Sequence, residues 1–235
     1  MLDVSRIRAI SLDLDDTLWP IWPCIERAEA VLHAWLVDNA PLTAKLFATA
    51  QALREIREHM NHHRPDLKHD LSALRRESIR LALERAGEDT ALAEPAFEVF
   101  FDARQDVTPF DDVLPALDAL AQRFPLVSLS NGNADLRRVG MARYFRGAIS
   151  AREFGVPKPD PRIFHAAAEL AGVRAEDVLH VGDDVLLDVI GAQGAGMQAA
   201  WINRGEALWP HDDRGPEVEC FSLGELQSLL LPSRG

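Results

Sequence analysis

The chain has 235 residues, of which 47% are hydrophobic and 26% are charged. This composition is typical of a globular protein and allows one large domain, or a domain with a sizeable insert. The formal net charge of −12 argues against nucleic acid or an anionic membrane surface as a partner. No window predicts a transmembrane helix or a secretory signal. Cys24 and Cys220 lie far apart without metal-type spacing, so we expect buried free thiols and a cytoplasmic protein.

The first predicted element is a strand. Residues 7–14, IRAISLDL, are nearly all apolar or small, which is typical of a parallel strand that is buried on both faces. Apolar residues then recur at three- and four-residue spacing, which predicts a series of helices. These expected helices span 24–40, 43–60, 70–87 and 92–105.

After residue 109 the pattern changes to alternating strands and helices. The expected strands are 126–130, 146–150, 177–182 and 197–202. The expected helices are 112–123, 134–143, 160–171 and 186–195, with a short closing helix at 222–230 in an otherwise irregular end. Such alternation predicts right-handed crossovers and a parallel sheet with helices on both faces. We therefore predict an α/β, Rossmann-like core made of residues 1–18 and 108–235, with an all-helical insert at 19–107.

The stretch SLDLDDTLWP, residues 11–20, places three aspartates within four positions after the first strand. Asp13 and Asp15 are two residues apart, so in an extended chain their carboxylates point the same way. Carboxylates that face one spot need a cation or a shared proton. Mg²⁺ is a hard cation that prefers oxygen ligands, and Asp183 could add a carboxylate from the end of another strand.

Other polar residues follow the remaining strands. Lys158 supplies a positive charge that could pair with Asp13 and with a phosphate oxygen. Ser130, Asn131 and the amide of Gly132 lie at a strand-to-helix turn, where they could donate hydrogen bonds to an anion. A carboxylate nucleophile, a carboxylate acid/base, a metal and an anion cradle together predict phosphoryl transfer.

These residues lie in four segments, DLDDT, LSNGN, KPDP and GDDVLLD, that resemble in this order the motifs of the haloacid dehalogenase-like superfamily. The resemblance implies that Asp13 attacks phosphorus, forming an aspartyl-phosphate, and that Asp15 protonates the leaving oxygen and then activates water. It implies Mg²⁺ held by the Asp13 carboxylate, the Asp15 carbonyl and Asp183. The expected phosphate-binding residues are Ser130, Asn131, Gly132 and Lys158. Contacts around the ligands are expected from Thr17, Asp184 and Asp188, with the role of Asp184 left open.

The helical insert resembles the superfamily's first class of cap, and this resemblance implies a small phosphorylated metabolite as substrate. A narrower resemblance lies in LVSLSNGNA, LHVGDDVLLDVIGA and GMQAAWINR, which look like bacterial phosphatases acting on flavin mononucleotide (FMN) and the phosphoribitylamino-pyrimidine of riboflavin synthesis. It implies one of these two phosphates as substrate. Trp19 and Trp22 either pack where the chain enters the insert or stack on a flat substrate.

Three other functions stay open at the level of sequence. A phosphomutase would use the same aspartyl-phosphate. A 2-haloacid dehalogenase would need neither a metal nor a second catalytic aspartate, so Asp15 argues against it. A non-catalytic interaction protein would be expected to lack the nucleophile or the acid, and both are present. A metal site at the insert histidines, His59, His62, His63 and His69, is disfavoured because no carboxylate or cysteine spacing supports it.

Overall fold

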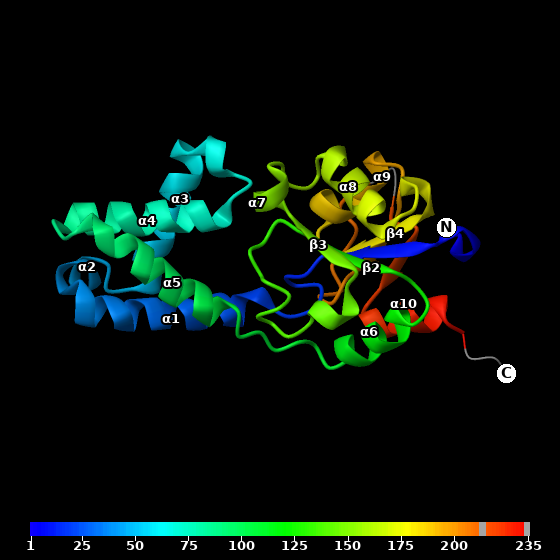
Figure 1. Cartoon of the computed structure of the whole chain (residues 1–235), viewed down its shortest axis with the longest axis horizontal. Helices are drawn as coiled ribbons and strands as arrows, with labels where there is room; N and C mark the ends of the chain where they lie inside the picture. The colour runs from blue at the N-terminus through cyan, green and yellow to red at the C-terminus, as the bar shows by residue number, and fades with distance from the viewer. Residues whose placement is uncertain (212–214, 233–235) are drawn as a thin grey trace. The chain divides into compact units, whose positions relative to one another are not determined.

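The computed structural model describes residues 1–211 and 215–232, and it divides into two compact units. The α/β unit comprises Met1–Pro20 and Thr108–Gly235, and the helical unit comprises Ile21–Val107. Figure 1 shows the course of the chain through both. Within the described ranges, no helix combines the length and the apolar character that crossing a membrane requires.

The α/β unit is built on a six-stranded sheet in the described part of the chain, with strand order β3-β2-β1-β4-β5-β6. Every neighbouring pair is parallel. The strands are β1 (Ala9–Leu12), β2 (Leu126–Ser130), β3 (Gly147–Ser150), β4 (Val178–Gly182), β5 (Gln198–Ile202) and β6 (Val218–Cys220). This arrangement confirms the predicted α/β, Rossmann-like class, and it places β1 and β4 side by side at the centre of the sheet.

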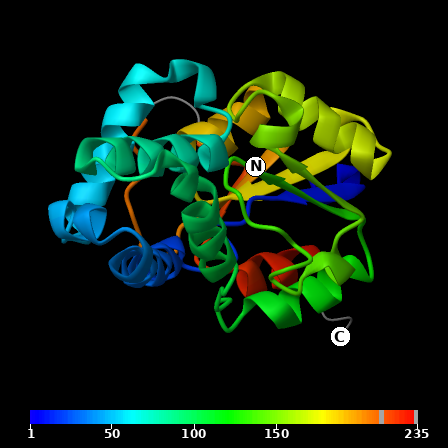
Figure 2. The same ribbon diagram turned by 60° about the vertical axis from the view of Figure 1, so that its left-hand side comes forward.

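Helices cover both faces of this sheet (Figures 1 and 2). On one face lie α8 (Pro161–Ala171) and α9 (Gly191–Gly194), and on the other lie α6 (Val113–Ala121) and α10 (Leu223–Leu230). Because side chains alternate along a strand, each strand contributes to both apolar layers. The layer under α8 contains buried residues from four strands: Ala9, Val127, Leu129, Val178, Ala199 and Trp201.

Two predicted elements differ from the structure in the α/β unit. The helix expected at 134–143 is a turn, with the 3₁₀ turn η4 at Ala142–Tyr144. The Asp135 carboxylate accepts from the Arg137 amide, and Gly140 adopts a φ of 78°, so local bonds compete with the helix. Strand β6 was missed, because three residues at a sheet edge give no periodic signal. The other short elements are η1 (Val4–Arg6), α7 (Ala151–Phe154), η5 (Ala175–Asp177) and the π-helix η6 (Val185–Ile190).

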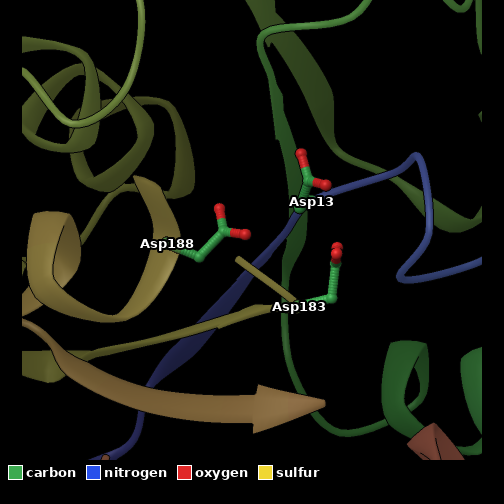
Figure 3. A group of neighbouring side chains, drawn as sticks. All are labelled: Asp13, Asp183 and Asp188. Carbon is green, nitrogen blue, oxygen red and sulfur yellow. The ribbon is translucent and has the colours of Figure 1, made fainter. Parts of the chain in front are cut away.

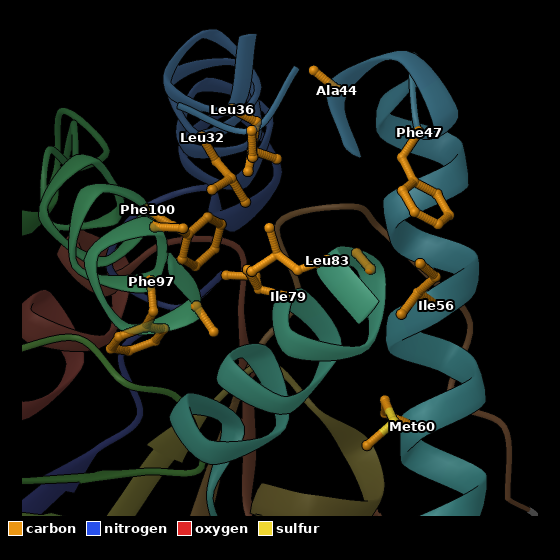
Figure 4. Close-up of a cluster of buried hydrophobic side chains, with 14 of the residues drawn as sticks. Leu32, Leu36, Ala44, Phe47, Ile56, Met60, Ile79, Leu83, Phe97 and Phe100 are labelled. Atoms are coloured by element: carbon orange, nitrogen blue, oxygen red, sulfur yellow. The ribbon is translucent and has the colours of Figure 1, made fainter. Parts of the chain in front are cut away.

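The helical unit has its own hydrophobic core (Figure 4). Its elements are α1 (Ile21–Asn39), α2 (Pro41–Leu46), α3 (Ala50–His63), η2 (Pro65–Leu67), α4 (Leu71–Ala86), η3 (Thr90–Leu92) and α5 (Ala93–Arg104). The helix predicted at 43–60 is broken between α2 and α3, where Thr49 accepts from the Ala52 amide and begins a new helix. Figure 4 shows side chains of α1, α3, α4 and α5 that meet in this core.

Candidate active site

The site lies at the carboxyl ends of β1 and β4. These strands pair in parallel with Leu12 opposite Val181, and the Asp13 amide continues the ladder by donating to the Val181 carbonyl at 2.9 Å. Asp13 and Asp183 therefore emerge next to each other. Together with Asp188, they place one carboxylate oxygen each within 4.8 Å of one another. Figure 3 shows the three carboxyl groups around a common space.

Lys158 reaches this cluster from the loop before α8. Its Nζ donates to Asp13 Oδ1 at 2.6 Å and to Asp188 Oδ1 at 2.5 Å, and the residue is buried. Burial alone would lower the pKa of Lys158, but the charges of Asp13 and Asp188 outweigh it and raise that pKa. Lys158 is therefore a fixed ammonium between two carboxylates.

One ammonium does not offset the charge of this cluster. Burial raises the pKa of Asp13 well above its usual value, and the charges of Asp188 and Asp183 add to this against the opposing effect of Lys158. Burial, followed by the nearby Asp188 charge, raises the pKa of Asp183 to about 7. With all three carboxyl groups ionised, the cluster would carry more buried negative charge than Lys158 can balance, which is why the pKa values of Asp13 and Asp183 are raised. Three convergent carboxylates with excess charge suit a hard divalent cation, so Asp13, Asp183 and Asp188 could hold a metal.

Thr17 and Asp184 fix the surroundings of this cluster. Thr17 Oγ1 donates to Asp183 Oδ1 at 2.8 Å. Asp184 is exposed, and its Oδ1 accepts from the amides of Leu186 and Leu187, so its side chain caps the π-helix η6. Its own amide donates to Asp188 Oδ2 at 3.0 Å. The structure thus gives Asp184, whose role the sequence left open, a capping position beside the cluster.

Asp15 lies in the loop that follows Asp13. Its Oδ1 accepts a hydrogen bond from Trp19 Nε1 at 2.8 Å. The next residue, Asp16, has a φ of 60°, a left-handed conformation that aspartate tolerates better than most residues. Asp15 also lies against the loop that follows β2, because a Cβ built on Gly132 would stand 2.3 Å from Asp15 Oδ2. Motifs far apart in the sequence therefore meet here.

Several polar groups of the segment Ser130–Gly132 already form hydrogen bonds within the protein. Ser130 Oγ accepts from the Gly132 amide at 3.0 Å. The Asn131 side chain bonds the backbone of Lys158 through both of its amide atoms, at 2.8 and 3.1 Å. Ser130 and Gly132 lie near Asp15, and their binding of an anion stays a prediction, whereas the Asn131 side chain holds the lysine segment in place.

Trp19 and His180 have contacts at the site that were not predicted. Trp19 was expected either to pack or to stack on substrate; it is fully buried, which agrees with packing, and its N–H bond to Asp15 is the unpredicted contact. His180 was not singled out, and it bonds Asp188 from within the sheet. Its sequence signal is a polar residue at an inward-facing position of a buried strand. Trp22 belongs to the helical unit and is 56% exposed.

Comparison with known proteins identifies the family. The family model of the haloacid dehalogenase-like hydrolases matches residues 7–196, which include every site residue described above. The chain belongs to this hydrolase family. A relative in Escherichia coli, the 5-amino-6-(5-phospho-D-ribitylamino)uracil phosphatase YigB, is 33% identical over 97% of this chain and 98% of its own. The glyceraldehyde 3-phosphate phosphatase of Methanopyrus kandleri is 30% identical over 95% of this chain and 96% of its own.

Solved structures of the same family share the fold of this haloacid dehalogenase-like hydrolase. A structure described as a 2-haloacid dehalogenase from Pseudomonas syringae pv. Tomato superposes with a TM-score of 0.87 and is 42% identical, covering 95% of this chain and 98% of the other. A phosphatase of the family from Thermococcus onnurineus has a TM-score of 0.69 at 22% identity, covering 97% of this chain and 100% of the other, and supports the fold alone.

Proposed function

We propose that this hydrolase is a Mg²⁺-dependent phosphomonoesterase that works through an aspartyl-phosphate on Asp13. The observation that carries the proposal is the convergence of Asp13, Lys158, Asp183 and Asp188, with Asp15 held beside them. It is supported by relatives along nearly the full chain that are named as phosphatases.

The chain's own residues account for both half-reactions. In the first, an Asp13 carboxylate oxygen bonds to phosphorus while the bond from phosphorus to the ester oxygen breaks, and Asp15 gives its proton to that oxygen. In the second, Asp15 takes a proton from water as the water oxygen bonds to phosphorus, and the bond from phosphorus to Asp13 breaks. Trp19 holds Asp15 through the 2.8 Å hydrogen bond, while Lys158 holds Asp13.

Asp13, Asp183 and Asp188 would hold the metal, and Thr17 would orient Asp183 from the side. When bound, Mg²⁺ supplies positive charge against the phosphoryl oxygens. Lys158 and the Ser130 hydroxyl would bind the remaining phosphate oxygens, and the Gly132 amide, which donates to Ser130 Oγ, would orient that hydroxyl. In this proposal the side chain of Asn131 orients Lys158 and does not contact phosphate.

The substrate that we propose is FMN or the ribitylamino-pyrimidine phosphate. The support is the name of the 33% identical relative, together with the motifs that resemble this group of phosphatases. The helical unit, residues 21–107, would act as a cap that distinguishes the organic part of the substrate, because the core residues address only the phosphoryl group.

A second candidate is dehalogenation, favoured by the 42% identical structure that carries that description. In a dehalogenase, an aspartate carboxylate bonds to the substrate carbon as the carbon–halogen bond breaks, and water then hydrolyses the resulting ester, so neither a metal nor a second catalytic aspartate is needed. The position of Asp15 beside Gly132 and Ser130 supports the phosphatase over this alternative.

The deciding experiment compares the two activities in one preparation. Hydrolysis of p-nitrophenyl phosphate, FMN and the pyrimidine phosphate is measured with Mg²⁺ and with EDTA, beside halide release from 2-chloropropionate. We expect metal-dependent phosphate release that is lost by several powers of ten in Asp13→Asn, because an amide cannot attack phosphorus. Asp111→Asn, an exposed aspartate, is the control and should retain activity. Halide release that survives EDTA, without phosphatase activity, would establish the dehalogenase.

A further inference from the structure

A buried polar pair interrupts the apolar layer beneath α8. Ser11 on β1 and His180 on β4 are direct neighbours in the parallel pairing, and each is 1% exposed. The residues around them on this face, such as Val127 and Val178, are apolar. Phe164 of α8 packs its ring edge-on against the His180 imidazole, with centroids 5.1 Å apart. An apolar pair would fill this layer without having to satisfy buried polar atoms.

The pair connects to the site through hydrogen bonds between buried side chains. Ser11 Oγ lies 2.8 Å from His180 Nδ1, and His180 Nε2 lies 3.1 Å from Asp188 Oδ1. The same Asp188 oxygen accepts from Lys158 Nζ, which also donates to Asp13. The chain of contacts therefore runs from the middle of the sheet to the proposed nucleophile.

The direction of these bonds follows from the chemistry of the groups. An ionised carboxylate only accepts, so His180 Nε2 must carry the proton that faces Asp188. With that proton on Nε2, the Nδ1 of a neutral imidazole carries a lone pair, and this atom faces the Ser11 hydroxyl at 2.8 Å. Ser11 must then donate its hydroxyl proton to Nδ1. Ser11 thus selects the tautomer of His180 that donates to Asp188.

Gly182 makes room for this arrangement. It lies two residues after His180 on β4 and therefore faces the same side of the sheet. A Cβ built on Gly182 would stand 2.2 Å from Asp188 Cγ. Because Gly182 has no side chain, the Asp188 carboxylate can lie close to the end of β4, where His180 contacts it.

We propose that His180, with its tautomer set by Ser11, is a positioning residue that fixes the Asp188 carboxylate and through it the Lys158 ammonium against Asp13. The inference rests on the proposed phosphatase function for its kinetic consequences. The Asp184 amide holds Asp188 at Oδ2, and a single bond there would let the carboxylate turn about it. The donor at Oδ1, from His180, removes this freedom and aims Oδ1 at Lys158. Partners that orient the ligands of a site commonly affect affinity or activity by about 10–100-fold.

The kinetic test uses His180→Leu, His180→Gln and Ser11→Ala, assayed with p-nitrophenyl phosphate at saturating Mg²⁺. We expect kcat to fall about 10–100-fold in His180→Leu with a much smaller change in KM, because substrate contacts remain. His180→Gln, which keeps a donor, should recover part of the loss, and Ser11→Ala should show a smaller loss. The control Leu179→Val, at a buried neighbour on the opposite face, should lower stability without changing kcat. A kcat of folded His180→Leu within about twofold of the wild type would overturn the proposal.

A second measurement needs no activity. Nitrogen NMR on ¹⁵N-histidine-labelled wild type, with His180→Gln used to assign the signal, reads which ring nitrogen of His180 carries the proton. The proposal requires a neutral ring protonated at Nε2, and Ser11→Ala should shift the Nδ1 signal. A ring protonated at Nδ1 would overturn it, whatever the variants do. A wild type that shows this tautomer yet hydrolyses no phosphate ester would instead refute the proposed function.

Discussion

At the scale of single residues, the contact between Trp19 and Asp15 determines how the proposed acid/base group is held. Trp19 is fully buried in the α/β unit, so its ring is a packing element, while its N–H is the donor to Asp15 Oδ1. A stacking role on substrate does not fit a side chain without exposed surface. The tryptophan after the aspartate motif therefore combines packing with orientation of Asp15.

Trp19→Phe separates these two contributions. Phenylalanine keeps much of the buried ring and removes the N–H, so we expect kcat to fall roughly tenfold, as for loss of one hydrogen bond to a charged group. KM should change little, and p-nitrophenyl phosphate is the substrate to measure. Trp35→Phe, which removes an indole that packs against the core of the helical unit, is the matched control. Equal kcat in Trp19→Phe and wild type would show that the hydrogen bond does not contribute.

Gly182 offers a second prediction at this scale. Gly182→Ala would place a methyl group 2.2 Å from Asp188 Cγ, so the carboxylate or the strand must move. We expect the free energy of unfolding to fall by about 1–3 kcal/mol, as in overpacked cores, together with a large loss of activity. Gly194→Ala is the comparison, because a Cβ added there would meet no atom within 4 Å. Thermal unfolding of both variants checks this, and similar melting temperatures would contradict it.

At the scale of elements, Asp112 joins segments that are distant in sequence. Its carboxylate accepts from both terminal nitrogens of Arg204 at 2.9 and 3.1 Å, and from the amides of Leu223 and Gly224 at the start of α10. Arg204 also donates to the Thr17 carbonyl in the loop after β1. One carboxylate thus ties α6, α10 and the motif loop together.

This junction predicts how stability depends on pH. Burial alone would raise the pKa of Asp112, but Arg204 and the two amides outweigh it and lower that pKa below 3.8. A carboxyl group whose pKa is lower in the folded protein contributes stability above the unfolded-state pKa, and this contribution is lost as the pH falls. Asp112→Asn should lower the free energy of unfolding by about 1–3 kcal/mol at about pH 7 and by less near pH 3. Urea unfolding at both pH values measures this, with exposed Asp118→Asn as control; an equal cost at both would contradict it.

At the scale of the whole molecule, the chain forms two units of different construction. The helical unit is one continuous segment with its own core, whereas the α/β unit is assembled from two segments, with β1 separated from β2 by the insertion. The prediction is that residues 21–107 fold alone. Their core holds large buried side chains from four helices, including Leu32, Ile56, Leu83 and Phe100.

The isolated segment should give a helical circular dichroism spectrum and a cooperative thermal transition. Phe100→Ala should abolish that transition or strongly lower its midpoint temperature, because deleting a buried phenylalanine lowers the free energy of unfolding by about 3–5 kcal/mol. Val37→Ala, at a position that is 51% exposed, should leave it nearly unchanged. A segment that is unstructured at low temperature would show that the helical unit needs the rest of the chain.

The class of the fold and the family follow from the sequence alone, whereas the chemistry of the site stays a prediction. Buried strands and amphipathic helices have different periods, so their alternation predicted the parallel sheet, and the aspartate motifs predicted which strand ends carry function. Two kinds of feature could be read only from the three-dimensional structure: local hydrogen bonds that replace a predicted helix, and contacts between residues that are distant in sequence. The turn at 136–140 replaced a predicted helix because side-chain bonds and Gly140 favoured it. Likewise, the pairing of Ser11 with His180 depends on strand register, which brings together residues far apart in the chain.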